Sequence, residues 1–343
     1  MLDGLRSYDP KNLYSVIKDS WQQGESGWNS SFSLNINASE ISNIIITGLG
    51  GSAISGDLMK NFLGAELKKP LIVNRTYSLP EFADEHTLVI ASSYSGNTEE
   101  TISALNTALS RRCKIIVLTT GGEAGRIAIE NGLHTVPLQK GFQPRYALYN
   151  SFFTLLRVFQ KLGITSITDS EVLNLISMLK DLGEEWSAES GLAFKTAVEL
   201  KGFTPVIYSA TDFNEAAGRR FKGQLNENSK LHAWSAEYPE MNHNEIVGWE
   251  TFGAQGVKYK IVNLYDEEMH PRVKRRFEII NNLLNNEKID IIKIDGKKES
   301  LRERLIEMVY LCDWISYFLA LLNEKDPGEI DFIHHLKDKM AEG

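Results

Sequence analysis

Short apolar runs alternate with helical stretches between residues 43 and 137, and this alternation is what most constrains the fold. The expected strands are Asn43–Thr47, Leu71–Asn74, Thr87–Ala91, Lys114–Thr119 and His134–Pro137. Because parallel strands need helical crossovers, the pattern predicts a parallel sheet with helices on both faces. In an open sheet of order 2-1-3-4-5, the loops after the first and third strands flank the crevice where ligands bind.

Two serine-rich loops occupy these two positions. The sequence Gly48-Leu49-Gly50-Gly51-Ser52 follows the first strand, and Ser92–Thr98 follows the third. Each loop opens an expected helix, whose first backbone N–H groups attract an anion. Neither loop has the Gly-x-x-x-x-Gly-Lys-Ser/Thr form that holds a nucleotide triphosphate. We therefore expect one phosphate on a small molecule, a sugar phosphate, bound by these residues: Gly51, Ser52, Ser93, Ser95 and Thr98.

The glycine loop also allows a dinucleotide. The spacing Gly48-x-Gly50-x-x-Ala53 fits the dinucleotide fingerprint, which tolerates alanine at its third position. That fold places an acidic residue at the end of the second strand, where this chain has Asn74-Arg75; Arg75 would suit at best a 2′-phosphate. An NADP-dependent oxidoreductase therefore remains an alternative, although it leaves the second serine loop unexplained.

The second half of the chain repeats the pattern without the serine loops. Helical periodicity covers Tyr146 to about Gly163 and Asp169 to about Ala188. Further strands are expected at Pro205–Ser209, Leu231–Trp234, Lys258–Leu264 and Ile289–Ile294, and helices at Asn214–Leu225, Pro271–Asn285 and Ser300–Leu322. We expect two α/β domains, residues 1–160 and 161–343, of which only the first binds phosphate.

Composition excludes several classes of function. Across 343 residues the net charge is -8, which argues against a nucleic-acid surface.

The two cysteines, Cys113 and Cys312, are too few for a disulfide framework and favour a reducing compartment. The N-terminus lacks the pattern of a secretory signal. The apolar stretch Met308–Leu322 contains Asp313 and is too short for a membrane span. We expect a cytoplasmic protein with a buried helix there and no membrane partner.

Two polar segments could carry proton transfer. Glu227 lies in Asn226–Lys230 at the end of an expected helix, and His243 lies in Glu240–Glu245. A carboxylate and an imidazole are the usual partners for this chemistry, yet each alone is more often a solvated or structural group. Taken singly, Arg145 reads as a charged residue in a loop, and Lys337 reads as a solvated charge on a helix.

No metal site or cofactor is expected. The histidines form no His-Glu-x-x-His pair, and the adjacent His334 and His335 point to different sides of any helix.

Several motifs together resemble one family, the bifunctional phosphoglucose/phosphomannose isomerases. They are Gly48–Ser52, Ser93–Thr98, Thr119–Gly122, Pro144-Arg145, Asn226–Lys230, Pro239–Asn244 and Leu336-Lys337. The resemblance implies two flavodoxin-like sugar-isomerase domains and a homodimer whose active sites lie between domains and subunits. It implies that Ser52, Ser93, Ser95 and Thr98 hold the 6-phosphate.

The resemblance also implies the catalytic roles. Glu227 would move a proton between C2 and C1 through a cis-enediolate, and Arg145 would stabilise that anion. His243, supplied by the neighbouring subunit, and Lys337 would act in ring opening. Because glucose 6-phosphate and mannose 6-phosphate share this enediolate, one metal-independent site would serve both.

Two other uses of such serine loops stay open beside the isomerase. A non-enzymatic sugar-phosphate sensor would carry a DNA-binding module, and the residues before Ile41 are too few for one. An aminosugar synthase would carry an N-terminal cysteine nucleophile ahead of the first sheet. The chain departs from the family pattern at Gly328, where a threonine often follows the Asp-Pro pair, and this bears on the balance of substrates.

Overall fold

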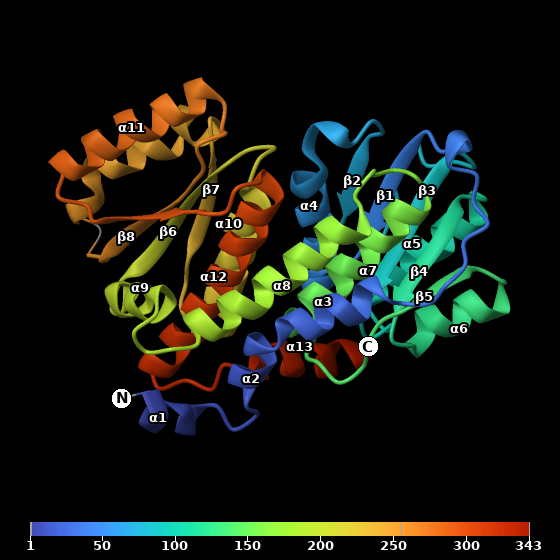
Figure 1. The fold of residues 1–343 in the computed structure, drawn as a ribbon, viewed down its shortest axis with the longest axis horizontal. Helices are drawn as coiled ribbons and strands as arrows, with labels where there is room; N and C mark the ends of the chain where they lie inside the picture. Colours follow the sequence, from blue (N-terminus) through green and yellow to red (C-terminus); the bar gives the residue numbers. More distant parts are fainter. Residues whose placement is uncertain (1, 255, 343) are drawn as a thin grey trace. The chain divides into compact units, whose positions relative to one another are not determined.

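The chain folds into two compact units, each built around its own parallel sheet (Figure 1). The computed structural model describes residues 2–254 and 256–342. The N-terminal unit comprises Asp19–Lys180, and the C-terminal unit comprises Met1–Lys18 together with Asp181–Gly343. The expected fold class, two parallel α/β domains, is confirmed. The units differ from the expected ranges 1–160 and 161–343 at both ends: residues up to Lys18 belong with the second half of the chain, and residues 161–180 belong with the first.

The sheet of the N-terminal unit has the strand order β2-β1-β3-β4-β5, as predicted, and all of its pairings are parallel. The strands are β1 (Asn43–Thr47), β2 (Leu71–Asn74), β3 (Thr87–Ser93), β4 (Lys114–Thr119) and β5 (His134–Pro137). In the central strands Ile46 pairs with Ile90, which in turn pairs with Ile116. Strand β3 runs two residues beyond its expected end, so Ser93 is part of the strand rather than of the loop.

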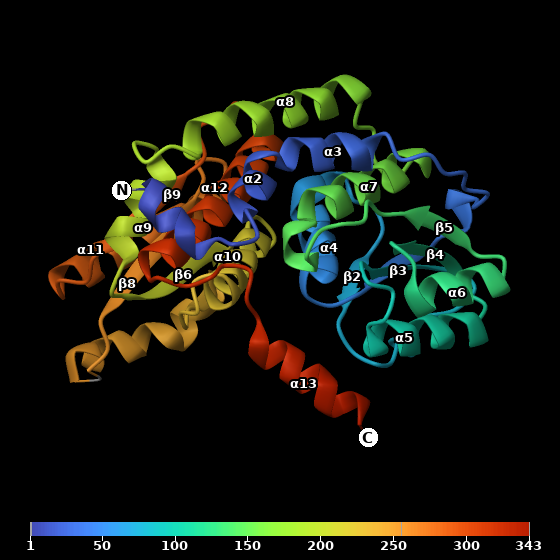
Figure 2. The same ribbon diagram turned by 90° about the horizontal axis from the view of Figure 1, so that it is seen from below.

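Helices cover both faces of this sheet (Figure 2). They are α3 (Ser20–Trp28), α4 (Gly50–Leu63), α5 (Glu99–Ser110), α6 (Gly122–Glu130) and α7 (Leu148–Lys161). On one face, α5 and α6 pack on a core that includes Ile45 and Val89. On the other, α4 packs where Gly56 lies against the side chain of Ile46. Both faces are therefore buried, which explains why these strands are continuous apolar runs.

The sheet of the C-terminal unit has the order β7-β6-β8-β9, again with parallel pairings. Its strands are β6 (Thr204–Ala210), β7 (Trp234–Tyr238), β8 (Tyr259–Tyr265) and β9 (Ile291–Asp295). The expected strand at Leu231–Trp234 is wrong. Leu231 instead belongs to the turn after the preceding helix, where its N–H donates to the Leu225 carbonyl at 3.2 Å. Pairing with β6 begins only at Trp234, opposite Val206.

The remaining helices have the following bounds. They are α1 (Leu2–Leu5), α2 (Leu13–Lys18), α8 (Asp169–Trp186), α9 (Leu192–Leu200), α10 (Glu215–Glu227), α11 (Pro271–Asn286), α12 (Leu301–Leu322) and α13 (Asp331–Ala341). The 3-10 helices are η1 (Arg6–Tyr8), η2 (Ala38–Glu40), η3 (Gly64–Glu66), η4 (Pro144–Tyr146), η5 (Glu240–His243) and η6 (Glu245–Ala254). The neighbouring helices α2 and α3 belong to different units.

Helix α12 is the core of the C-terminal unit. Ser300 and Glu303 form a capping box at its start, which fixes its first turn. The most apolar 18-residue window of this 22-residue helix has a mean hydropathy of 1.7, enough by length and composition to cross a membrane, yet the window is wholly buried within the fold. Phe318 stacks on Trp314 and also meets Phe194 of α9 edge-on. The expectation of a buried helix over Met308–Leu322 is confirmed.

The first residues of the chain are anchored to α12. The Asp9 carboxylate accepts hydrogen bonds from the backbone N–H groups of Leu13 and Tyr14, and so begins α2. The same carboxylate accepts a hydrogen bond from the Tyr317 hydroxyl of α12 at 2.9 Å. The Tyr310 hydroxyl, on the same helix, donates to the Ile17 carbonyl at 2.7 Å. These bonds make α2 part of the C-terminal unit.

A buried ion pair joins α10 to α12. The Arg220 guanidinium donates to both carboxylate oxygens of Asp313, each at 2.9 Å, and Gln224 donates to one of them at 3.1 Å. Both charged side chains are 5% exposed. Such a pair gains little over an apolar replacement of both residues, but removing one partner leaves the other charge buried without compensation.

We predict that Asp313→Leu lowers the free energy of unfolding by about 3–5 kcal/mol, because it leaves Arg220 charged in the core. The double variant Arg220→Met/Asp313→Leu should lose far less, since it removes both charges. Urea unfolding of the full-length protein, followed by tryptophan fluorescence and circular dichroism, measures the difference. Equal losses in the single and double variants would contradict this view of the pair.

Candidate phosphate-binding and acid–base residues

The loops after β1 and β3 are in direct contact at the carboxyl edge of the first sheet. A Cβ on Gly48 would lie 2.6 Å from the Ser92 carbonyl oxygen, so only glycine allows this approach. From the first turn of α4, Ser52 accepts a hydrogen bond at its Oγ from the Tyr94 backbone N–H at 3.2 Å. The two serine loops predicted from the sequence therefore pack directly against each other.

The hydroxyl groups of the second loop are ordered by hydrogen bonds within it. Ser93 Oγ lies 3.0 Å from Thr98 Oγ1 and accepts from the N–H of Gly96, which adopts a φ of 73°. Ser95 Oγ accepts from the Asn97 N–H at 3.2 Å. Ser93 is buried, whereas Ser95 is exposed and Thr98 is half-buried, so the hydroxyls span the depth of the loop. A hydroxyl that accepts one hydrogen bond can still donate its proton to an anion.

Two helix N-termini meet this edge. Helix α4 begins at Gly50, within the first loop, and α5 begins at Glu99, directly after Thr98. Their first backbone N–H groups have no partner within the helix and carry a partial positive charge. Gly51, Ser52 and Thr98 thus lie at the two helix starts, which is the arrangement that binds a phosphate.

A third loop, after β4, supports the second serine loop. The Gly96 carbonyl accepts from the Ala124 N–H at 2.8 Å, and the Asn97 side-chain oxygen accepts from the Glu123 N–H at 3.0 Å. A Cβ on Gly96 would lie 1.8 Å from the Gly121 carbonyl oxygen. The start of α6 therefore fixes the backbone of the serine loop.

Arg145 is brought to the first loop by the segment after β5. It lies in η4, and a Cβ on Gly51 would come within 2.4 Å of the Pro144 carbonyl oxygen and 3.3 Å of the Arg145 Cα. Arg145 is 5% exposed. The backbone of Arg145 thus lies against the start of α4, in the first serine loop.

Tyr94 holds this segment in place, a role that sequence analysis missed. Its hydroxyl donates to the Gln139 carbonyl at 2.8 Å and accepts from the Phe142 N–H at 2.9 Å. Burial raises the pKa of Tyr94, which keeps the hydroxyl protonated and able to donate. In the sequence, the one sign of this role is the position of Tyr94 between two loop serines. Its hydrogen-bond partners lie 45 and 48 residues away, so no local pattern indicates them.

Arg75, the candidate for a dinucleotide 2′-phosphate, is engaged elsewhere. Its guanidinium forms an ion pair with Asp57 of α4. The arginine that follows the second strand therefore stabilises a neighbouring helix.

Glu227 is the last residue of α10, and its helix end is firmly held. Ser229 Oγ donates to the Ser316 carbonyl of α12 at 2.7 Å, and the Asn228 side chain donates to Ser316 Oγ at 3.0 Å. Lys230 Nζ donates to the carbonyls of Glu227, Asn228 and Asp326. Glu227 itself is half-buried. The backbone that carries the Glu227 side chain is therefore held by α12 and by Lys230.

His243 and Lys337 lie on two further elements of the same unit. His243 ends η5 and Lys337 belongs to α13, and both residues are exposed. Figure 2 shows α13 extending away from the body of its own unit. The structure thus groups Arg145 with the predicted phosphate ligands, whereas Glu227, His243 and Lys337 occupy three separate elements of the C-terminal unit.

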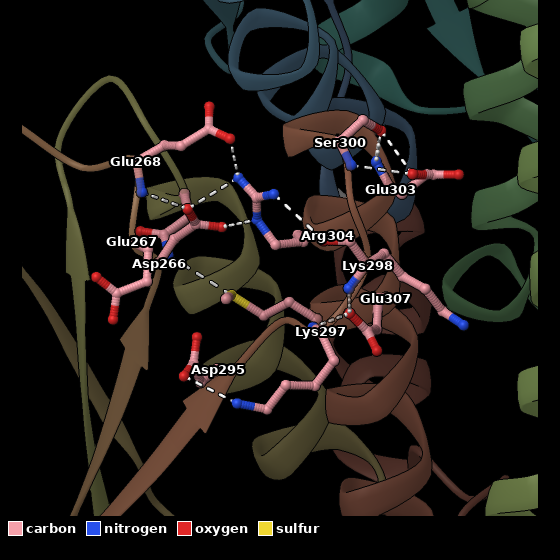
Figure 3. A network of polar contacts seen from close by, with 12 residues as sticks. Asp266, Glu267, Glu268, Asp295, Lys297, Lys298, Ser300, Glu303, Arg304 and Glu307 are labelled. Carbon is pink, nitrogen blue, oxygen red and sulfur yellow. Dashed lines mark hydrogen bonds and ion pairs between the residues drawn. The ribbon is translucent and has the colours of Figure 1, made fainter.

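The corresponding edge of the second sheet has the opposite chemistry (Figure 3). Asp266, after β8, accepts from the Arg304 guanidinium at 2.6 and 3.1 Å, and Glu268 accepts from it at 2.7 Å. These hydrogen bonds raise the pKa of Arg304 further. A Cβ on Gly296, which follows β9, would lie 2.7 Å from the Arg304 Cβ. The arginine at this edge is thus already paired with carboxylates, which would repel a phosphate.

Sequence analysis found no metal site, but three potential ligands meet at the start of α13. Ligand atoms of Glu329, Asp331 and His334 lie within 4.8 Å of one another. A hydrogen bond from one carboxyl to the other raises the pKa of Asp331, and a bond from the Ile330 N–H helps to lower that of Glu329. Asp331 and His334 are exposed, and such surface groups are common without an ion.

Comparison with known proteins identifies both halves. Residues 39–155 match the SIS domain family, and residues 189–340 match the bacterial phospho-glucose isomerase C-terminal SIS domain. A glucose-6-phosphate isomerase like protein from Thermus thermophilus has the same fold, with a TM-score of 0.65, 13% identity and coverage of 98% of this chain and 97% of its own.

Two curated relatives carry the same name as each other and align with this chain over most of their length. The bifunctional phosphoglucose/phosphomannose isomerase of Caldicellulosiruptor bescii is 39% identical over 96% of this chain and 97% of its own. The protein of the same name from Aquifex aeolicus is 35% identical over 87% and 90%. The chain belongs to the bifunctional phosphoglucose/phosphomannose isomerase family.

Proposed function

We propose that this enzyme interconverts glucose 6-phosphate and mannose 6-phosphate with fructose 6-phosphate. The observation that carries this proposal is the carboxyl edge of the first sheet, where two helix starts, the serine hydroxyls and Arg145 converge. The two sugars differ only at C2 and lose that difference in a shared cis-enediolate. A site that fixes the phosphate and leaves room around C2 therefore serves both.

The phosphate role falls to Gly51, Ser52, Ser93, Ser95 and Thr98. Backbone N–H groups at the starts of α4 and α5 and the loop hydroxyls donate to the phosphate oxygens. The hydrogen bonds among Ser93, Gly96 and Thr98 support this role, because they order the loop before ligand arrives. Binding energy from the phosphate then holds the reacting end of the sugar in position.

The chemical role falls to Glu227, His243, Lys337 and Arg145. Ring opening moves a proton to the ring oxygen and removes one from the anomeric hydroxyl, which suits His243 and Lys337. Glu227 then takes the proton from C2 of the aldose and returns it to C1, while the enediolate carries the negative charge. A fixed cation, Arg145, stabilises that charge more strongly in a largely dry site than in water.

A homodimer with shared active sites is part of the proposal, with His243 supplied by the neighbouring subunit. Exposed apolar side chains on α13 support assembly: Phe332 is 93% exposed, and Leu336 and Met340 follow on the same helical face. Such a face on a protruding helix is typical of a surface that another chain covers.

We also propose that the enzyme works in the cytoplasm. Both cysteines are free thiols, and burial raises the pKa of Cys113 to about 11. Free thiols, rather than disulfides, suit a reducing compartment.

Purified protein with EDTA present should form fructose 6-phosphate from both aldose phosphates in a coupled assay. Glu227→Gln should lower kcat about a hundred- to ten-thousand-fold with a smaller change in KM, because the amide cannot accept the C2 proton. Glu287→Gln, at the exposed end of α11, is the matched control and should retain full activity. An active Glu227→Gln variant would show that Glu227 is not the base. An inactive wild-type protein would rule out the isomerase function.

The double variant Ser95→Ala/Thr98→Ala should raise the KM for fructose 6-phosphate about tenfold or more, since hydrogen bonds to charged groups are lost. The inhibition constant of inorganic phosphate should rise in parallel. Ser110→Ala, at the opposite end of α5, controls for the substitution itself. Unchanged constants in the double variant would place the phosphate elsewhere.

Mixing two inactive variants tests the shared site. If each site combines Glu227 of one subunit with His243 of the other, dissociated and reassociated Glu227→Gln and His243→Ala dimers should recover about a quarter of wild-type activity. Each mixed dimer then holds one intact site. Light scattering checks that dimers re-form, and no recovery from re-formed dimers would place both residues in one subunit.

A further inference from the structure

A separate cavity lies on the sheet of the C-terminal unit, near the amino ends of its strands. Its volume is about 270 Å³, and its walls include Trp234, Trp249, Tyr259 and Glu245. Trp234 and Tyr259 are the first residues of β7 and β8, whereas the serine loops follow strands of the other sheet. Trp234 is 49% exposed, so the cavity reaches solvent beside its ring. The cavity is thus built from residues to which the proposed isomerase reaction gives no role.

Three aromatic rings form a continuous wall of this cavity. The ring centroids of Trp234 and Tyr259 are 6.1 Å apart, and those of Trp249 and Tyr259 are 5.5 Å apart, both pairs at steep angles. Val206, opposite Trp234 in the strand register, adds an apolar side chain to the lining. The faces of such rings carry negative potential, which attracts a cation.

The carboxylate of Glu245 is oriented by a chain of hydrogen bonds. Trp249 donates from Nε1 to the Tyr208 hydroxyl at 2.7 Å, and Tyr208 donates to Glu245 Oε1 at 2.8 Å. Burial raises the pKa of Tyr208, so the hydroxyl remains a donor. The Glu245 side chain is half-buried and lines the cavity. One carboxylate oxygen is thus fixed by Tyr208, and the carboxylate retains further lone pairs that can accept from a ligand.

We propose that this cavity binds a small organic cation that carries an ammonium group. The charged wall residue is an anion and three aromatic rings line the same cavity, so an ammonium can meet a carboxylate and a ring at once. A sugar phosphate, which is anionic, is repelled by the same groups. The volume lies just below the usual range of drug-sized pockets and suits a cation of a few carbon atoms. This site is independent of the isomerase assignment.

Choline and its neutral isostere 3,3-dimethylbutan-1-ol, which differ in charge and hardly in shape, test the proposal on the full-length protein. In calorimetric titrations choline should bind with a Kd of about a millimolar. The Kd of the neutral isostere should be at least about tenfold higher. Equal binding of the two, or no binding of choline at concentrations well above this range, would overturn the proposal.

Two variants locate the bound cation. Glu245→Gln keeps the acceptor for Tyr208 but removes the charge, and Trp234→Leu removes an exposed ring wall. Each should weaken choline binding roughly tenfold, whereas Glu250→Gln, exposed on η6 and outside the cavity wall, should bind as wild type does. Circular dichroism checks folding, and Trp234→Leu keeps the test valid if Glu245→Gln misfolds. Wild-type affinity in a folded variant of either residue would place the cation elsewhere and overturn the assignment.

Discussion

Parallel pairing of the strands is the constraint on which the rest of the structure depends. Parallel strands need helical crossovers, so every strand in a sheet ends at the same edge and both faces are covered. In the first sheet the central residues Ile44–Ile46 and Leu88–Ile90 are fully buried. The chain therefore leaves polar chemistry to the strand ends, where β1 and β3 deliver Gly48–Ser52 and Ser93–Thr98 to one place.

The two sheets are both parallel and differ in what stands at that edge. In the first, small residues let backbone N–H groups and hydroxyls face a ligand, and Gly51 admits the segment of Arg145. In the second, Arg304 is held by Asp266 and Glu268, so its charge is neutralised inside the fold. One architecture thus suits an anion site in one unit and a structural ion-pair network in the other. The proposed contribution of the C-terminal unit is instead Glu227, at the anchored end of α10.

Sequence patterns predicted most strands because buried apolar runs leave a strong local signal, as Asn43–Thr47 and Lys114–Thr119 show. The strand expected at Leu231 was wrong because that residue serves the turn after α10, a use set by tertiary contacts. The predicted meeting of the serine loops was confirmed, whereas the support that Tyr94 gives across 45 residues has no local pattern. The roles of Glu227 and His243 came from the family resemblance and stay predictions.

The C-terminal unit is discontinuous in sequence, since Asp9 and α2 complete a core formed around α12. On the ribosome the first 18 residues are made long before their partner helix, while Asp19–Lys180 can fold as it emerges. The opening segment must therefore wait, without its partner, through the synthesis of an entire intervening unit. Completion of the last long helix is then the event that joins the two ends of the chain into one core.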